Sequence, residues 1–171
     1  TIEITITETE PMQVLNDDIS LQTQYEGYGV SCFGASDGAI DIITTGGTEN
    51  YSYDWSAVTE EGQEITITTD NQDPNPDNPG DLINLSAGIY TVLVTDENEC
   101  PISTEITITE TEPMQVLNDD SALQTQYAGY GVSCFGESDG AIDINTTGGA
   151  GDYSYNWSAV TEEGQEITIT T

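Results

Sequence analysis

Carboxylates are the groups best suited to chemistry in this sequence, because its 171 residues include 32 Asp or Glu and no Lys, Arg or His. In one proline-rich loop, oxygen-bearing side chains stand at positions 1, 3, 5 and 9, as ligands do in calcium-binding loops: Asp73, Asn75, Asp77 and Asp81. The glycine of this loop is at position 8 instead of 6, and no Glu follows at position 12. The loop is therefore a candidate calcium site, with an acidic, proline-stiffened surface loop as the alternative.

Aromatic side chains offer a second kind of chemistry, the stacking of a ring on a ligand. Tyr25, Tyr28 and Phe33 lie in a glycine-rich stretch, and Tyr127 and Tyr130 stand in a second copy of it. If the tyrosines are exposed, they form a platform on which sugar rings could stack. The alternative is that they seal the end of a domain or the joint between two domains. The four tyrosines are therefore candidate glycan contacts.

The absence of cations, which leaves a formal charge of −32, excludes several classes of function. Nucleic-acid binding requires Lys and Arg to displace counterions from phosphate, and adhesion to anionic membranes requires them too. A His base, a Lys Schiff base and an Arg clamp are all impossible. Acidic pairs such as Glu60-Glu61 have nothing beyond their charge to mark them as glycosidase carboxylates. We do not expect an enzyme.

The chain contains an internal repeat with a period of 102 residues. Residues 1–69 align with residues 103–171 without a gap, and 58 of the 69 pairs are identical. Proline ends a strand because it cannot donate to a ladder, so Pro11 and Pro113 mark the boundaries. We expect residues 1–10 to be the last strand of a preceding repeat, 11–112 a complete repeat and 113–171 an incomplete next one.

Alternating Ile and Thr residues, as in Ile106-Thr107-Ile108, predict half-buried β-strands. Seven strands are expected in the complete repeat, near residues 12–25 (irregular), 39–44, 51–56, 64–69, 82–86, 89–95 and 102–109. Short strands at this spacing are typical of a two-sheet sandwich. The segment from Leu85 to Tyr90 is similar to a tyrosine corner. The predicted fold is all-β, with tandem immunoglobulin-like antiparallel β-sandwich repeats arranged head to tail.

Differences between the two copies indicate which side chains face solvent. Ile43 is replaced by Asn145, and Asp54 by Asn156. Because successive strand residues point to opposite faces, Ile43 and Asp54 are expected on the outside. The inward face then holds residues that recur unchanged: Ile40, Ile42, Tyr51, Tyr53 and Trp55.

Short motifs of the repeat follow one another in a characteristic order. They run Cys32-x-Gly34, Asp37-Gly38-x-Ile40, Gly46-Gly47, Tyr51-x-Tyr53-x-Trp55, Leu85-x-x-Gly88-x-Tyr90 and Thr95-Asp96-x-x-x-Cys100. This order resembles the SprB repeat of giant cell-surface adhesins in gliding bacteria, over roughly residues 30–112 and again 132–171. The resemblance implies a secreted, surface-anchored array, exported by the type IX route and used in adhesion or gliding.

Two cysteines of the complete repeat, Cys32 and Cys100, would form a disulfide in an exported protein. Cys134 is the copy of Cys32 and would pair with a cysteine outside residues 1–171. A bridge between repeats, such as Cys100–Cys134, and free buried thiols are the alternatives. A reactive nucleophile is not expected, because no cation is present to lower a thiol pKa.

The sequence predicts a structural segment of a giant bacterial surface adhesin or filament that acts as an extended spacer or adhesive fibre. Its expected location is extracellular, with signal and anchor outside these residues. Its expected partners are neighbouring repeats, and also surface polysaccharide or other filament chains. The alternatives are an array of carbohydrate-binding modules and a self-assembling extracellular sheath. Calcium is the one cofactor considered.

Overall fold

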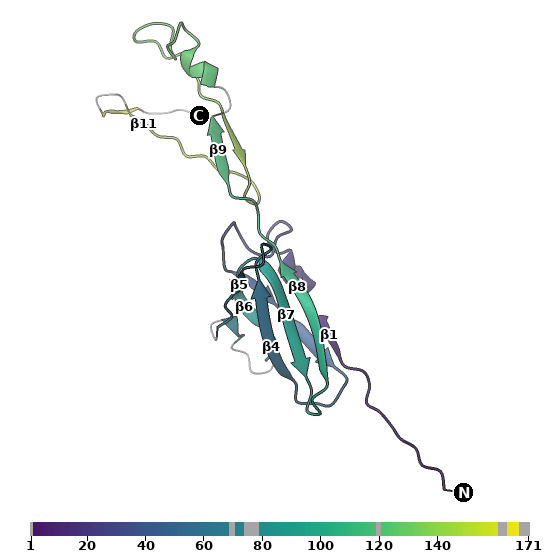
Figure 1. Cartoon of the computed structure of the whole chain (residues 1–171). Coiled ribbons are helices and arrows are strands. Elements are labelled where there is room, and N and C mark those ends of the chain that lie inside the picture. Colours follow the sequence, from purple (N-terminus) through teal and green to yellow (C-terminus); the bar gives the residue numbers. More distant parts are fainter. Residues whose placement is uncertain (1, 69–70, 74–78, 119–120, 161–163, 168–171) are drawn as a thin grey trace. The chain divides into compact units, whose positions relative to one another are not determined.

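The computed structural model describes residues 2–68, 71–73, 79–118, 121–160 and 164–167. The chain forms two compact units, which can be followed in Figure 1 by the colours that run from the N-terminus to the C-terminus. The first comprises residues 1–115 and 147–150, and the second comprises residues 116–146 and 151–171. Among the residues described, no helix has the length and apolar character needed to cross a bilayer.

One layer of the first unit is a four-stranded antiparallel sheet. Its strand order is β5-β4-β7-β8. The strands are β4 (Ser52–Val58), β5 (Glu64–Ile65), β7 (Gly88–Thr95) and β8 (Pro101–Ile108). The sequence predicted a strand at each of these four places, but in the described part of the predicted strand near 64–69 only Glu64–Ile65 pairs.

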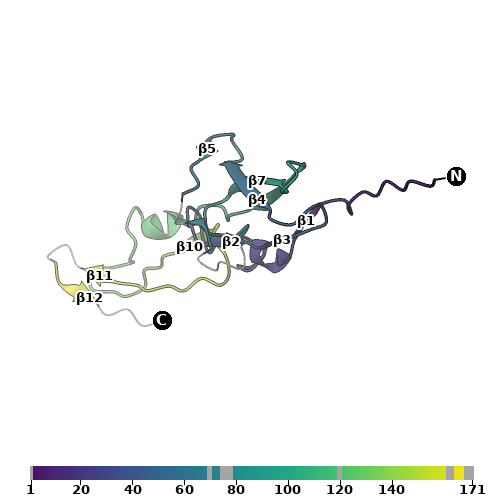
Figure 2. The ribbon, with the colours of Figure 1, turned by 90° about the horizontal axis from the view of Figure 1, so that it is seen from below.

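The other layer is built from four short antiparallel strands. In it, β1 pairs with β3 and β2 pairs with β6. The strands are β1 (Gln13–Asn16), β2 (Gly38–Ile40), β3 (Ile42–Thr45) and β6 (Leu82–Leu85). In Figure 2, β4 and β7 lie on one side of the first unit and β2 and β3 on the other. The structure thus confirms the predicted all-β fold, a two-layer antiparallel sandwich. The immunoglobulin-like head-to-tail arrangement of repeats stays a prediction.

The hydrophobic core lies between these two layers. On β7, Tyr90, Val92 and Val94 are each at most 1% exposed, and the residues between them are less buried. The remaining core residues come from both layers and one loop: Val30, Ile40, Ile42, Ala57, Leu82, Leu85, Ile106 and Ile108. Met12, Val14, Tyr51, Tyr53 and Trp55 are among the half-buried residues packed against them. The predicted inward face is therefore confirmed, and Ile43 is exposed as expected.

The predicted tyrosine corner is present at the start of β7. The Tyr90 hydroxyl donates to the backbone carbonyl of Ser86 at 2.9 Å, a bond that ties the strand to the connection that precedes it. Burial raises the pKa of Tyr90 above its ordinary value. The hydroxyl therefore keeps its proton and remains a donor at any physiological pH.

The first predicted strand, over residues 12–25, is the element that differs most from expectation. Only β1 is a strand, and a short 3-10 helix, η1 (Ile19–Gln22), follows it. Asp18 caps this helix by accepting a hydrogen bond from the Ser20 backbone N–H at 3.1 Å. An aspartate cap competes with strand pairing, which explains why the strand ends at Asn16.

The second copy of the sequence repeats the local structure but not the burial. Strands β9 (Gln115–Asn118) and β10 (Ile144–Thr147) pair as β1 and β3 do, and the 3-10 helix η3 (Ser121–Thr125) matches η1. A further antiparallel pair consists of β11 (Ala159–Val160) and β12 (Glu166–Ile167). Ile142, the copy of Ile40, is 64% exposed, whereas Ile40 is 1% exposed. The strands of residues 82–108 are therefore what encloses the core of the first unit.

Candidate functional site

A groove of about 650 Å³ lies at one end of the sandwich in the first unit. It sits where β4 and β8 end and β7 begins, because residues 59–61, 63, 87 and 108–112 line it. Two aromatic residues and four carboxylates also line it: Tyr28, Phe33, Glu60, Glu61, Glu110 and Glu112. One of the predicted glycan contacts, Tyr28, is therefore part of a concave surface.

A tight hairpin positions Tyr28. Tyr25 and Tyr28 exchange two backbone hydrogen bonds of 3.0 Å, and Glu26 and Gly27 form the turn with φ values of 52° and 97°. The next residue, Gly29, donates to the Thr109 carbonyl at 3.0 Å. A Cβ on Gly29 would lie 2.9 Å from the Ile108 side chain, so glycine allows the hairpin to approach the end of β8.

Phe33 lies on a loop that is fixed at both of its ends. Val30 is fully buried, and the Ser31 N–H donates to the Asp37 carboxylate at 3.0 Å. Hydrogen bonds from Ser31 lower the pKa of Asp37, so this bond is charge-assisted at neutral pH. The Gly34 N–H donates to the Glu110 carboxylate. The Phe33 ring, between these anchors, is still 54% exposed.

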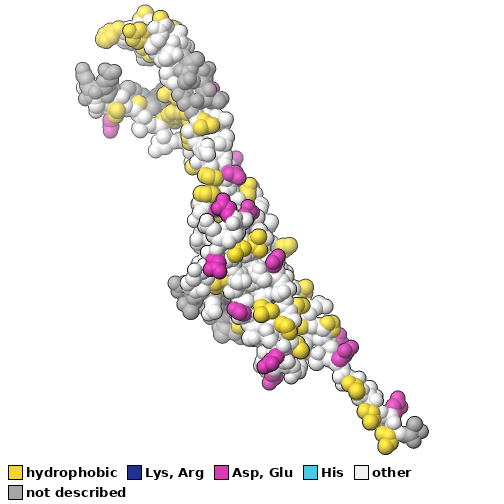
Figure 3. Space-filling model, in the orientation of Figure 1, with side chains coloured by type: hydrophobic (Ala, Val, Ile, Leu, Met, Phe, Trp, Pro, Cys, Tyr) yellow, Lys and Arg dark blue, Asp and Glu magenta, His cyan; other side chains and the backbone are white. Residues whose placement is uncertain are grey.

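The electrostatic character of the groove is uniformly negative. Glu60 and Glu61 occupy the turn between β4 and β5, which is closed by a bond of 2.8 Å from the Thr59 N–H to the Gln63 carbonyl. Because the chain contains no Lys, Arg or His, no cationic side chain neutralises the groove carboxylates. Figure 3 shows Asp and Glu side chains scattered over the visible face of the first unit and no Lys or Arg side chain.

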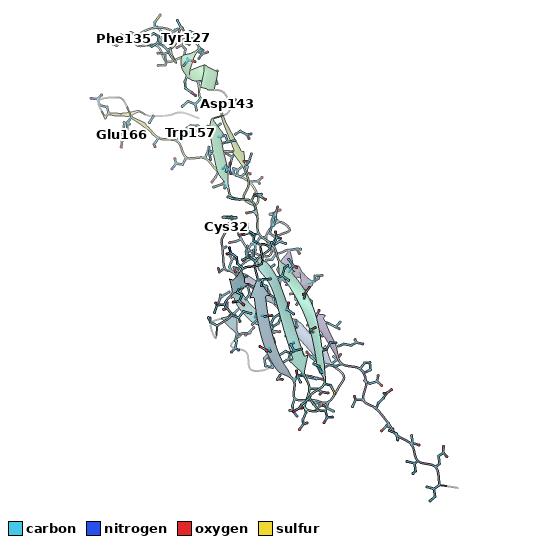
Figure 4. The ribbon with its side chains drawn as sticks, viewed as in Figure 1. Cys32, Tyr127, Phe135, Asp143, Trp157 and Glu166 are labelled. Carbon is cyan, nitrogen blue, oxygen red and sulfur yellow. The ribbon has the colours of Figure 1, made fainter. Side chains whose placement is uncertain are left out.

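The other three tyrosines predicted as glycan contacts do not line this groove. Tyr25 faces Tyr28 across the hairpin. In the second unit, Tyr127 and Tyr130 form the same antiparallel bridge, and Tyr130 is 73% exposed. Figure 4 labels both Tyr127 and Phe135 in the second unit. Of the three aromatics in the first glycine-rich stretch, the structure therefore brings Tyr28 and Phe33 together in the groove and leaves Tyr25 outside it.

The predicted calcium loop is only partly described. Asn75 and Asp77 lie outside the described residues. Asp81 is 4% exposed, and its carboxylate accepts from the Ile42 N–H at 2.9 Å, so it anchors β3. The Asp73 N–H donates to the Asp81 carbonyl at 3.2 Å. In the described part of the chain, no group of three or more His, Cys, Asp or Glu side chains is arranged to hold a metal. Calcium binding here stays a prediction.

Asp41, which separates β2 from β3, carries an unfavourable charge. Its pKa is raised, first by burial and then by the negative charges of Asp17, Asp18 and Asp73, and a hydrogen bond with Asp81 only partly offsets this. Because the folded-state pKa exceeds the unfolded value, the charged carboxylate destabilises the folded state at neutral pH. Protonation of Asp41 removes this cost, so the folded state gains stability only as the pH falls toward 3.8.

Replacing Asp41 by asparagine is therefore expected to raise the melting temperature at pH 7, by a few degrees. Asparagine keeps the size of the side chain and removes its repulsion with the neighbouring carboxylates. Asp143→Asn is the matched control, because Asp143 is the same residue of the second copy and is exposed. Thermal unfolding followed by circular dichroism measures both. An Asp41→Asn melting temperature equal to or below that of the wild type would contradict this interpretation.

Asp96 has a structural role that the sequence pattern did not reveal. Its carboxylate accepts backbone N–H bonds from Thr48 (2.9 Å), Asn98 (3.0 Å) and Cys100 (2.9 Å). It thereby joins the β7–β8 turn to the Gly46-Gly47 turn. These bonds, chiefly that from Thr48 and then that from Cys100, lower the pKa of Asp96 to about 2.

The stability that Asp96 contributes is expected to depend on pH. Its folded-state pKa of about 2 is below the ordinary value of 3.8, so the contribution is complete above pH 3.8 and is lost as the pH falls through about 2. We expect Asp96→Asn to be less stable than the wild type at pH 7, and the difference to shrink over this interval. Urea unfolding of both proteins at several pH values measures it. A difference that stays constant down to pH 2 would exclude this role.

The predicted Cys32–Cys100 disulfide is absent from the structure. Cys32, Cys100 and Cys134 are all free and exposed. Cys100 precedes the first residue of β8, whereas Cys32 is two residues from Gly34, which bonds to Glu110 beyond the last residue of that strand. Eight strand residues span about 26 Å, whereas disulfide-bonded Cα atoms lie within about 7 Å. Figure 4 marks Cys32 at the groove end of the unit. Pairing between repeats stays a prediction.

The short motifs of the repeat were compared with known protein families. The model of the SprB repeat matches residues 30–59 and 132–161. Two segments of the chain, one in each copy of the internal repeat, therefore match the SprB repeat. No curated protein and no solved structure matches the chain. The matched segments contain Phe33, β2 to β4 and the Gly46-Gly47 turn, and the tyrosine corner and Asp96 lie downstream of the first match. SprB repeats are typical of cell-surface proteins.

Proposed function

We propose that this chain is a repeat segment of a bacterial cell-surface adhesin or filament in which each repeat acts as a spacer. The observation that carries the proposal is that one 102-residue period, residues 11–112, supplies every buried side chain of a closed hydrophobic core. A unit that closes on its own interior can be repeated many times without changing its fold. The SprB repeats support a surface location.

The charge of the chain suits an extended, unaggregated array. A net charge of −32 without a single cation makes every repeat repel its neighbours and other chains. The edge strands β5 and β8 carry the exposed acids Glu64 and Glu105, which oppose edge-to-edge pairing between molecules. Salt screens this repulsion over about 8 Å at physiological ionic strength. Extension is therefore expected to persist in saline surroundings.

The length of engineered arrays tests the spacer function. Chains with one, two and four copies of residues 11–112 are expected to grow by about 35–45 Å per copy, given the rise of the strands and the loops at each end. Small-angle X-ray scattering measures the maximum dimension of each. A dimension that fails to grow with copy number would mean that repeats pack side by side, and the spacer function would be wrong.

Further parts of the proposal concern what the array does and where. We propose that the array serves gliding or surface attachment and is exported to the cell exterior. We also propose that the 73–81 loop binds calcium and that each repeat has neighbouring repeats as partners. A self-assembling sheath is the rival structural role. Mass per length along single filaments, measured by scanning transmission electron microscopy, distinguishes one chain from a lateral assembly of many.

A further inference from the structure

The groove lined by Tyr28 and Phe33 has the features of a ligand site. Phenylalanine is usually buried, yet the Phe33 ring is 54% exposed on a loop whose two ends are anchored. Tyr28 is half-buried in the same groove, so the ligand would meet two ring faces. An exposed aromatic surface on a fixed scaffold is what stacking on a sugar ring requires.

An unsatisfied hydroxyl in the same groove is a second, independent sign of a ligand. Thr111 lines the groove and is 2% exposed, and its hydroxyl oxygen has no hydrogen-bond partner among the described residues. Buried polar groups are nearly always paired, so an unpaired one indicates a missing partner. A hydroxyl or ammonium group of a bound sugar would supply it.

The charge of the groove selects the kind of sugar. Glu60, Glu61, Glu110 and Glu112 line it, and no cation of the chain opposes them. An anionic polysaccharide would be repelled, and a neutral one would gain nothing from the negative charge of the carboxylates. A protonated amine makes charge-assisted hydrogen bonds with carboxylates and is attracted to aromatic ring faces.

A polysaccharide fits the groove better than a cationic peptide does. Extended peptides usually bind by pairing with the free edge of a strand. Three backbone donors near this groove are already used: the Thr59 N–H bonds to Gln63, the Gly62 N–H to Thr59 and the Gly29 N–H to Thr109, at 2.8–3.0 Å. The groove instead offers aromatic rings, carboxylates and a hydroxyl, and these side chains suit a sugar.

We propose that this groove binds a polysaccharide with free amino groups, a polymer of de-N-acetylated hexosamine. Tyr28 and Phe33 stack on the sugar rings, Glu60 and Glu61 hold the ammonium groups, and Thr111 completes its hydrogen bonding with the ligand. This site goes beyond the spacer function, which depends on repeat length alone. Loss of binding would leave the length measurement unaffected, so the two proposals fail separately.

Titration calorimetry on the 171-residue protein tests this assignment, with a glucosamine hexasaccharide as the probe at mildly acidic pH. Phe33→Ala is expected to weaken binding about tenfold. Phe135→Ala is the matched control, since Phe135 is the same residue of the second copy and its ring is fully exposed. An unchanged affinity for Phe33→Ala, or an equal loss for Phe135→Ala, would overturn the proposal.

A second variant keeps the test valid if Phe33→Ala perturbs folding. Thr111→Val removes a buried hydroxyl that has no partner, so the melting temperature is expected to stay the same or rise while the affinity falls severalfold. Thr9→Val is its control, because Thr9 is the copy of Thr111 in the other repeat and is exposed. Unchanged affinity in Thr111→Val would argue against the site.

Non-specific attraction of a polycation to an acidic protein must also be excluded. The pair Glu60→Gln with Glu61→Gln is expected to weaken binding more than the pair Glu97→Gln with Glu105→Gln, which removes the same charge outside the groove. Equal losses would show attraction to total charge alone. Equal binding of the N-acetylglucosamine hexasaccharide would overturn the amino-sugar class, and the same dependence of hexalysine binding on Phe33 would identify a peptide site instead.

Discussion

Replacing Gly46 by alanine is expected to destabilise the complete repeat by about 3 kcal/mol or more. Gly46 has a φ of 75°, where a side chain is strained, and a Cβ there would lie 2.2 Å from the Pro11 carbonyl oxygen. The clash is with backbone, so β1 would have to move away from β3. Two bonds that hold this corner would be disturbed: Gly47 N–H to Glu10, and Tyr51 hydroxyl to the Gly46 carbonyl.

Gly62→Ala separates the cost of backbone strain from the cost of the clash with Pro11. Gly62 has a similar φ of 81°, but a Cβ there would contact nothing within 4 Å. It is expected to cost only the backbone strain, about 1–2 kcal/mol. Urea unfolding of the two variants and the wild type gives both free energies. Equal losses for Gly46→Ala and Gly62→Ala would show that the approach of Pro11 is unimportant.

Replacing Ile40 by alanine is expected to cost about 2–5 kcal/mol, because a fully buried isoleucine leaves a cavity in the core. Ile40 is 1% exposed and pairs with Leu82 across the β2–β6 ladder. Its copy, Ile142, has the same neighbours in sequence and is 64% exposed. Ile142→Ala is therefore expected to change the unfolding free energy by less than about 0.5 kcal/mol.

The comparison of these two variants isolates the environment from the residue type. Chemical denaturation followed by the fluorescence of Trp55 and Trp157 measures both losses on the same chain. If Ile142→Ala destabilised the protein as much as Ile40→Ala, both copies would have closed cores. That result would contradict the exposure seen in the second unit.

The strands of the complete repeat were predictable because local pattern and burial agree in them. On β7 the alternation of Tyr90, Val92 and Val94 with less buried residues is both the sequence signal and the packing. Copy differences at Ile43 and Asp54 located the outer face, since a residue that packs on nothing is free to change. The tyrosine corner followed from a local motif whose two partners are four residues apart.

The features that the sequence did not reveal depend on contacts between distant segments. Asp96 was part of a recognised motif, but the sequence did not reveal its role because its partner Thr48 lies on another turn. Cys32 and Cys100 seemed a natural pair, but β8 places them at opposite ends of the sheet. The groove combines Phe33 with Glu60 and Thr111, three segments that only the folded sandwich brings together. Composition alone gives no information about such juxtapositions.

Hydrogen exchange on the intact chain tests most directly whether residues 11–112 enclose a core of their own. Peptides from β4 and its copy are distinguishable by mass, because Asp54 is replaced by Asn156. We predict slow exchange throughout β4 and β7, where every residue of β4 pairs with β7, and fast exchange over residues 153–160. Equal protection of the two copies, or rapid exchange in β7, would contradict the account of a self-contained repeat.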